Sequence, residues 1–409
     1  MKTTPIERLL QSSKHLVLSG AGIVGERVME FCRQQGLTVV AVCDGSTRVA
    51  GTVFHGHTVI HTSRLAEQFD DALVLISVAA IKDVVDSLQT QGLTDWVAAG
   101  PLLEDMDINQ NDPELDYAKF SIESCITIHR GFLDPEKTFL RSVDIIITER
   151  CSLKCKDCAN LMQYYERPRN VPLDLVFQSI DALCSLTDEI MEMRVIGGDA
   201  FMNKDWPQVV KKLTDEPKIK RVLIYTNGTI VPSSNTIEIL KHTKVYVIVT
   251  DYGTLSRNLG RLRTFLTEHT IAHRILGFDS WLDCASIGKH DRPPEENARV
   301  YQECCAKNML SLSDGKLFRC PFAANADRLA AVPEFPTDYV DVLSEAASQD
   351  ALEIRRKRLT DYVLHKDTLK ICDYCDGRPL AGKEVTPAVQ ISKPLLYQRH
   401  SRTKAQTSE

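Results

Sequence analysis

The segment Asp144–Cys158, DIIITERCSLKCKDC, joins a short apolar run to three cysteines. The β-branched residues of this run are typical of a buried strand, because such side chains pack well inside a sheet. Cys151, Cys155 and Cys158 follow at spacings of four and three residues, on the loop that leaves the predicted strand. Three thiolates with this spacing can hold one face of a cubane iron–sulfur cluster and leave the fourth iron without a protein ligand.

The open iron would decide the chemistry of such a site. A closed site of four cysteines transfers electrons or holds a fold together, whereas an open one takes a ligand into its coordination sphere. A structural zinc site remains the alternative for the three cysteines alone. Their spacing resembles the CxxxCxxC signature of the radical S-adenosylmethionine (SAM) enzymes. The resemblance implies a [4Fe-4S] cluster whose open iron binds SAM, cleavage of SAM to methionine and a 5′-deoxyadenosyl radical, and an electron donor such as a flavodoxin or ferredoxin.

Two later motifs extend this resemblance. Gly197-Gly198-Asp199 is similar to the Gly-Gly-Glu-Pro motif of the family, with Asp in place of Glu. The resemblance implies that the glycines let SAM lie against the backbone and that the acid holds its ammonium group. Thr226 and Asn227 are similar to the Thr-Asn-Gly motif that lies near the SAM ribose. All three motifs follow predicted strands, and ligands of parallel α/β sheets bind at the carboxyl ends of strands.

Strands and helices alternate between residues 141 and 280. This alternation predicts α/β architecture, and with the resemblance it predicts a partial (β/α)6 barrel. Asp251 and Tyr252 follow one of the predicted strands, so they are candidates for catalytic residues that face the substrate. The alternative is a turn acid and a packing aromatic residue.

A second group of cysteines lies between residues 281 and 385. The Asp-Gly pair at 314–315 predicts a β-hairpin that would bring Cys305 and Cys320 together, and Cys372 and Cys375 would complete four ligands. The pattern resembles the SPASM and twitch domains of radical SAM enzymes, which implies a second [4Fe-4S] cluster. Four thiolates are equally suited to structural zinc.

The sequence leaves one ligand undecided and suggests a role for one further cysteine. The spacing does not decide between Cys304 and Cys305 as a ligand. Cys284, just after the predicted barrel, is a candidate donor of a hydrogen atom to a substrate radical.

The alternation of apolar runs with helical segments in residues 1–100 predicts a separate Rossmann-like domain with a parallel sheet. A glycine-rich turn with Gly20, Gly22 and Gly25 lies between a predicted strand and helix, and Asp44 ends the next predicted strand. This arrangement can bind a nucleotide or sugar nucleotide through its pyrophosphate and ribose. Equally, the glycines can serve only the tight turn and close helix packing. Residues 101–140 are expected to form a connector, and residues 386–409 a solvated tail.

Bulk properties narrow the classes of protein further. With 409 residues the chain is long enough for two or three domains, and its formal charge of −6 provides no basic surface for nucleic acid. No segment approaches the length of a membrane span, and no signal peptide is evident. The 13 cysteines, several in metal-type spacings, favour a reducing cytoplasm over a disulfide framework.

The leading hypothesis is a radical SAM oxidoreductase or epimerase that removes a hydrogen atom from a sugar or sugar nucleotide. The Rossmann-like domain and its resemblance to domains of glycan-assembly proteins favour this substrate class. A nearby second cluster would accept an electron and give dehydrogenation, whereas a thiol that returns hydrogen would give epimerisation. The alternatives are a peptide-modifying radical SAM maturase and a non-catalytic iron–sulfur or zinc scaffold.

Overall fold

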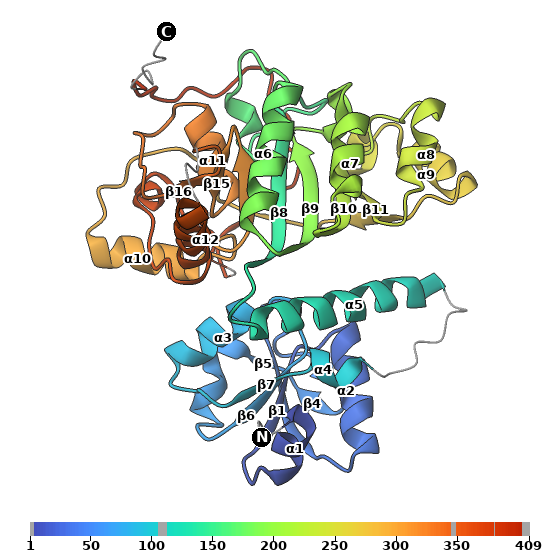
Figure 1. Cartoon of the computed structure of the whole chain (residues 1–409), viewed down its shortest axis with the longest axis vertical. Coiled ribbons are helices and arrows are strands. Elements are labelled where there is room, and N and C mark those ends of the chain that lie inside the picture. Colours follow the sequence, from blue (N-terminus) through green and yellow to red (C-terminus); the bar gives the residue numbers. More distant parts are fainter. Residues whose placement is uncertain (1–3, 105–112, 345–348, 380, 403–409) are drawn as a thin grey trace. The chain divides into compact units, whose positions relative to one another are not determined.

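The computed structural model describes residues 4–104, 113–344, 349–379 and 381–402. The chain divides into two compact units, Met1–Lys137 and Thr138–Glu409 (Figure 1). Part of the expected connector, residues 105–112, and the end of the expected tail, residues 403–409, lie outside the described residues.

The first unit is built on a parallel sheet of five strands in the order β5-β2-β1-β6-β7. The order reverses between β1 and β6, and the glycine-rich turn leaves the carboxyl end of β1. Its strands and helices are α1 Pro5–Gln11, β1 Leu16–Ser19, α2 Ile23–Gln34, β2 Val39–Asp44, β3 Val53–Phe54, β4 His57–Thr58, β5 Ile60–His61, β6 Leu73–Ile76, α3 Ile81–Thr90, β7 Trp96–Ala98, α4 Gly100–Leu103 and α5 Pro113–Leu133.

The segment expected to be a connector contains α4 and α5, and α5 packs against α2, α3 and α4 within the first unit. Ile122 and Cys125 of α5 join the core of this unit. His129 is fully buried, and its ring accepts a hydrogen bond from the Gly100 amide at 3.0 Å and donates one to the Val78 carbonyl at 2.9 Å. Burial lowers the pKa of His129 to about 4, so the ring is neutral at pH 7. The first unit therefore extends well past residue 100.

The second unit contains a sheet of eight strands in the order β12-β11-β10-β9-β8-β14-β15-β16. The run of parallel strands comprises β8 Phe139–Thr148, β9 Glu189–Gly197, β10 Ile219–Thr226, β11 Val245–Asp251 and β12 His273–Gly277. A sixth parallel strand, β14 Leu310–Ser313, lies on the other side of β8 and is followed by the antiparallel strands β15 Lys316–Phe318 and β16 Tyr339–Asp341. The sixth parallel strand thus comes from beyond the segment expected to form the barrel, from the hairpin predicted at the Asp-Gly pair.

Helices and short elements complete the second unit. Figure 1 shows α6 and α7 side by side along the strands β8 to β11. The helices are α6 Leu173–Leu186, α7 Trp206–Asp215, α8 Ile237–Leu240, α9 Leu259–Glu268, α10 Pro294–Glu303, α11 Pro321–Arg328 and α12 Gln349–Leu364, and β13 Trp281–Leu282 pairs with β17 Glu384–Val385. None of the described helices combines the length and apolar character that a membrane crossing requires.

The two faces of this sheet differ in polarity. Residues such as Met193 and Val222 belong to the same core cluster as the apolar side chains of α6 and α7. The alternate positions carry polar side chains, and in register Asp144 stands beside Arg194, while Glu192 stands beside Arg221. Side chains of paired residues in a parallel sheet point to the same side. The face turned away from α6 and α7 is therefore rich in charged groups.

Residues 386–402, expected to be a solvated tail, run along the second unit instead. The Lys156 amide donates to the Val389 carbonyl at 2.7 Å, and the Ile391 amide donates to the Lys154 carbonyl at 2.9 Å. Farther along, the His400 amide donates to the Ala330 carbonyl at 2.8 Å. We call residues 386–402 the C-terminal strap. Its low apolar periodicity concealed these contacts, because they are made largely through the backbone.

The glycine-rich turn of the first unit yields a test of its packing role. A Cβ atom at Gly25 would lie 2.1 Å from the Gly20 carbonyl oxygen, whereas a Cβ at Gly22 meets nothing within 4 Å. We expect Gly25→Ala to destabilise the first unit by about 1–3 kcal/mol, the cost of overpacking. Gly22→Ala is the matched control and should change stability by less. Native-state hydrogen exchange of peptides from residues 16–44 measures both, and equal protection in the two variants would contradict the packing role.

Candidate functional site

The three cysteines of the loop after β8 come together in the second unit. Cys155 is 7% exposed and packs with Leu153 and Ala388, and Cys151 and Cys158 lie against this cluster. Burial raises the pKa of Cys155 to about 11, and the neighbouring Cys158 thiol adds to this effect. Buried thiols in such a group are protonated unless cations neutralise them, and metal coordination deprotonates a thiol outright.

The Gly-Gly pair after β9 lets the backbone approach the cysteine loop. A Cβ at Gly197 would lie 2.0 Å from the Thr148 carbonyl oxygen, and a Cβ at Gly198 would lie 2.2 Å from the Arg150 carbonyl oxygen. The Gly198 amide donates to Thr148 at 3.1 Å, and the amide of the next residue, Asp199, donates to Arg150 at 2.9 Å. The glycines therefore serve the contact between two segments of this chain, and a contact with SAM stays a prediction.

Asp199 is occupied by donors from the protein. It is 1% exposed, and its Oδ2 accepts hydrogen bonds from the Thr226 hydroxyl and the Asn227 amide, both at 2.9 Å. Its Oδ1 accepts from the Phe201 amide at 3.0 Å. Burial raises the pKa of Asp199, and these hydrogen bonds oppose the rise. Asp199 thus joins the ends of β9 and β10, so the shorter acid at this position has a structural task of its own.

Asn227 connects the third motif to the cysteine loop. Its Nδ2 donates to the Ser152 hydroxyl at 3.0 Å and lies 3.5 Å from the Cys151 sulfur. Its Oδ1 accepts from the Thr229 amide at 3.1 Å. Because Asp199 holds Asn227 and Asn227 holds the loop, the three sequence motifs meet at one place at the carboxyl edge of the sheet.

Asp251 and Tyr252 take different places after β11. The Asp251 carboxylate accepts from the Gly253 amide at 2.8 Å, as a turn acid does. Tyr252 packs beside the three-cysteine cluster, and its ring meets Trp281 edge-on at 5.6 Å between centroids. Burial raises the pKa of the Tyr252 hydroxyl, and the nearby thiols add to the rise. Trp281 follows no motif in the sequence, so sequence reasoning did not find it.

The second group of cysteines lines one cavity, and its fourth member is Cys304 rather than Cys305. Cys304 lines the cavity with Cys320, Cys372 and Cys375, whereas the side chain of Cys305 is exposed. The sequence left the choice between Cys304 and Cys305 open; the cavity favours Cys304, and the metal ligand itself stays a prediction. The reason is local, because Cys304 has extended backbone at the end of α10 and neighbouring residues of an extended chain point to opposite sides.

The surroundings of this cavity favour an anionic group. Arg319 is 2% exposed and donates to the carbonyls of Lys307 and Tyr362 at 2.9 Å, both neutral partners. The Ala323 amide donates to the Cys320 sulfur at 3.4 Å, and burial raises the pKa of Cys320 to about 12. A buried cation and amide donors beside thiols suit a metal–thiolate group, whose net charge is negative.

No group of three or more His, Cys, Asp and Glu side chains within residues 4–104, 113–344, 349–379 and 381–402 is arranged to hold a metal ion. The fit of the two cysteine groups to metal centres therefore rests on their donor chemistry. At the first group the donors to sulfur include Gln390, at 3.2 Å from Cys155, and Asn227. Amide hydrogen bonds to sulfur are a feature of iron–sulfur ligation.

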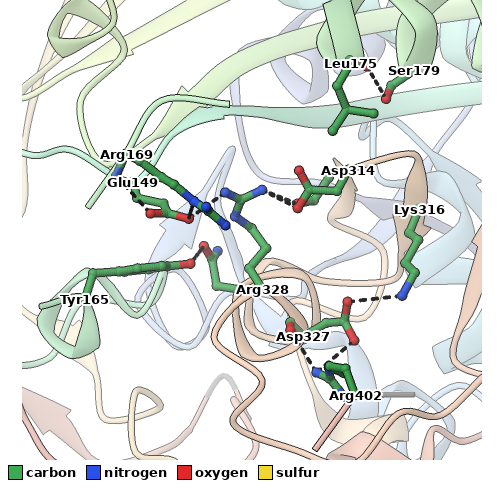
Figure 2. A network of polar contacts seen from close by, with 12 residues as sticks. Glu149, Tyr165, Arg169, Leu175, Ser179, Asp314, Lys316, Asp327, Arg328 and Arg402 are labelled. Carbon is green, nitrogen blue, oxygen red and sulfur yellow. Dashed lines mark hydrogen bonds and ion pairs between the residues drawn. The ribbon is translucent and has the colours of Figure 1, made fainter. Parts of the chain in front are cut away.

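A buried ion pair joins the first cysteine loop to α11. Glu149, two residues before Cys151, accepts from Arg328 Nη2 at 2.6 Å, and the two side chains are only 6% and 5% exposed (Figure 2). Arg328 also pairs with Asp314. Because α11 begins next to Cys320 and ends at Arg328, this one helix links Cys320 to the residue that starts the first cysteine loop. Charged residues at these positions carry no motif, so the pair was not predicted.

Two other predicted sites are placed differently. Cys284 is 6% exposed, and burial raises its pKa to about 11. It is not among the residues that line the cavity of the second cysteine group, and its role as a hydrogen donor stays a prediction. In the first unit, Asp44 accepts from the Ala21 amide at 3.0 Å and the Ser46 amide at 2.8 Å. Its carboxylate is engaged with the turn itself, and nucleotide binding there stays a prediction.

Comparisons with known proteins point the same way as the three motifs. No family model matches the chain. The chain is 30% identical over 87 residues to a GTP 3′,8-cyclase of Stenotrophomonas maltophilia (strain R551-3), which is 21% of this chain and 26% of that protein. It is 28% identical over 96 residues to the GTP 3′,8-cyclase of Clostridium acetobutylicum, 22% of this chain and 30% of that protein. GTP 3′,8-cyclases are radical SAM enzymes. Over these stretches the chain is similar to radical SAM enzymes.

The matched stretches span roughly a quarter to a third of these relatives. Among solved structures, BtrN in complex with AdoMet and 2-DOIA superposes with a TM-score of 0.37 at 15% identity over 58% of this chain and 93% of that chain. The enzyme anSMEcpe with bound AdoMet gives 0.39 at 11% identity over 56% and 82%. These similarities are too weak to carry a substrate or a reaction to this chain.

An experiment can test which of the adjacent residues Cys304 and Cys305 is a metal ligand. We expect Cys304→Ser to remove the metal of the second group, about four irons per chain if it is a [4Fe-4S] cluster. Cys305→Ser, the matched control, should retain it. Anaerobic iron, sulfide and zinc quantitation on both purified variants measures the difference. Metal loss in Cys305→Ser with retention in Cys304→Ser would reverse the assignment.

The buried ion pair makes a second prediction. Arg328→Met leaves the Glu149 carboxylate buried without its partner, which should cost about 3–5 kcal/mol of folding free energy. Arg169→Met is the control, because Arg169 also lies near Glu149 but its side chain is 81% exposed. Chemical denaturation of the second unit, followed by fluorescence of Trp206 and Trp281, compares them. A similar small loss in both variants would show that the pair contributes little.

Proposed function

We propose that this protein is a radical SAM enzyme that removes a hydrogen atom from a sugar or sugar-nucleotide substrate. The observation that carries the proposal is the meeting of three motifs at one edge of the sheet. Asp199 binds Asn227, and Asn227 binds the loop of Cys151. The described part of the chain gathers only these three thiols there, with Cys155 and Cys158, which matches a cluster with one open iron.

Each motif has a task in this proposal. A cluster held by the three cysteines supplies, when bound, the electron that cleaves SAM to the 5′-deoxyadenosyl radical. Cys151, Cys155 and Cys158 would be its ligands, and the Gly197-Gly198 backbone fixes the approach of their loop. Tyr252 and Trp281 close the apolar side of the thiol group, which would keep water from a reactive radical. The electron would come from a flavodoxin or ferredoxin in a reducing compartment, for which we propose the cytoplasm.

The polar face of the sheet supports a polar substrate. Arg194 lies 2.6 Å from Asp144, and both side chains are largely buried at 15% and 2% exposure. Burial opposes the charge of Arg194, but Asp144, Tyr225 and Glu192 together outweigh it and raise the pKa of the guanidinium. Arg194 Nη2 is buried and has no hydrogen-bond partner. A hydroxyl or phosphate oxygen of a sugar nucleotide would satisfy this donor.

The second cysteine group bears on the outcome of the reaction. Cys304, Cys320, Cys372 and Cys375 would hold a second [4Fe-4S] cluster, which would supply an electron acceptor for a dehydrogenation in which the substrate radical also releases a proton. Arg319 favours the negative charge that such a cluster carries. Cys284 is the candidate thiol that would return a hydrogen atom to the substrate radical, and that step would give epimerisation instead.

The proposal is tested by SAM cleavage. Wild type reconstituted anaerobically and reduced with dithionite should form 5′-deoxyadenosine, and the triple variant Cys151→Ala/Cys155→Ala/Cys158→Ala should form none while losing about four irons per chain. Cys32→Ala, a buried cysteine of the first unit, is the matched control and should keep both properties. Liquid chromatography of 5′-deoxyadenosine and anaerobic iron quantitation provide the readouts.

The substrate class is tested in the same assay. A sugar nucleotide should accelerate 5′-deoxyadenosine formation in wild type and not in Arg194→Gln, whose cluster content should be unchanged. Acceleration by peptides instead would favour a maturase. No SAM cleavage by fully reconstituted wild type would sink the radical mechanism and leave a metal scaffold.

A further inference from the structure

We propose that the C-terminal strap, residues 386–402, is a cover for the first cysteine group and that Gln390 is its positioning residue. This inference rests on the proposed function for its redox consequence. Gln390 Nε2 donates to the Cys155 sulfur at 3.2 Å, and Gln390 Oε1 accepts from the Lys154 amide at 2.8 Å. One side chain thus holds both the sulfur and the backbone next to it.

Backbone contacts set this amide in place. Val389 and Ile391, on either side of Gln390, pair with Lys156 and Lys154 in short antiparallel contacts of 2.7 and 2.9 Å. These contacts bracket Cys155 from both sides, so the register of the strap against the loop is fixed. Gln390 Nε2 also donates to the Ala388 carbonyl at 2.7 Å, which orients the amide with its N–H groups toward the sulfur.

The strap supplies part of the burial of the thiol. Ala388 is 2% exposed and belongs to the same apolar cluster as Leu153 and Cys155. Gln390 itself is exposed, so it lies on the solvent side of the sulfur. Removing this layer would open Cys155 to water and oxygen, the agents from which an iron–sulfur cluster needs protection.

The far end of the strap is tied to α11. Arg402 donates to the Asp327 carbonyl at 2.8 Å and lies 3.1 Å from the Asp327 carboxylate (Figure 2). Between these ends, Tyr397 donates to the Leu329 carbonyl at 3.2 Å. The strap is therefore anchored at the cysteine loop and at the helix that pairs with Glu149, and a segment held at both ends stays in place as a cover.

A hydrogen bond to a ligating sulfur also acts on the cluster. It stabilises the added negative charge of the reduced state, so it raises the reduction potential. Gln390→Leu removes the donor at nearly constant volume and should shift the potential of the SAM-binding cluster to more negative values. Gln398→Leu is the matched control, since it makes the same exchange at an exposed position of the strap without a described contact.

The experiment has two readouts, one of which needs no cluster. In metal-free full-length protein, iodoacetamide alkylation of Cys155, followed by mass spectrometry, should be several times faster in Gln390→Leu than in wild type and Gln398→Leu. Alkylation of Cys32, buried in the first unit, is the internal reference. In reconstituted protein, a redox titration followed by electron paramagnetic resonance should show the negative shift in Gln390→Leu alone.

The outcomes separate this proposal from the proposed function. Equal alkylation of Cys155 in all three proteins would overturn the cover, whether or not a cluster assembles. Faster alkylation with an unchanged potential would overturn the action of Gln390 on the cluster. A wild type that binds no iron would sink the radical mechanism, whereas protection of its Cys155 by Gln390 would still support the cover.

Discussion

The close approach of two backbones at the carboxyl edge of the sheet is the constraint on which the candidate site depends. The chain after β9 passes the start of the cysteine loop so closely that no side chain fits at Gly197 or Gly198. The amides of Gly198 and Asp199 then donate hydrogen bonds to carbonyls at the start of that loop. These backbone hydrogen bonds continue the pairing of β8 with β9 into the loop. Without this contact the three thiols would sit on a free loop, and a cluster would have to order it at an entropic cost.

The polar groups around this contact form a hydrogen-bond network in which each member binds the next. Asp199 uses both carboxylate oxygens on the protein, and one of its partners is the backbone amide of Asn227, whose side-chain Nδ2 contacts Cys151 and Ser152. Each member satisfies a buried donor or acceptor of the next, so loss of one leaves its neighbour without a partner. On the other side Glu149 enters the ion pair with Arg328. The cysteine loop is thus held on one side by Asp199 and Asn227 and on the other by the Glu149–Arg328 pair, and none of these residues is a proposed metal ligand.

The sequence could predict what local patterns encode. The α/β architecture is confirmed, because apolar runs and their alternation with helices report burial directly. The choice between Cys304 and Cys305 escaped prediction, since it depends on the backbone angle at the end of α10. The pairing of β14 with β8, the helix α5 and the contacts of Arg328 also escaped it, because they join residues far apart in the chain by packing and charge rather than by spacing.

The position of the strap in the sequence implies an order in which the parts of the second unit are synthesised. During synthesis, the sheet, the cysteine loop and α11 all leave the ribosome before residues 386–402, so under our proposal the sulfur of Cys155 gains its cover only after these parts have been made. Cluster assembly factors would meet an open loop in the nascent unit and a covered one afterwards. Because the strap follows the cysteine loop in the chain, insertion of a cluster would come first and its shielding from solvent would come second.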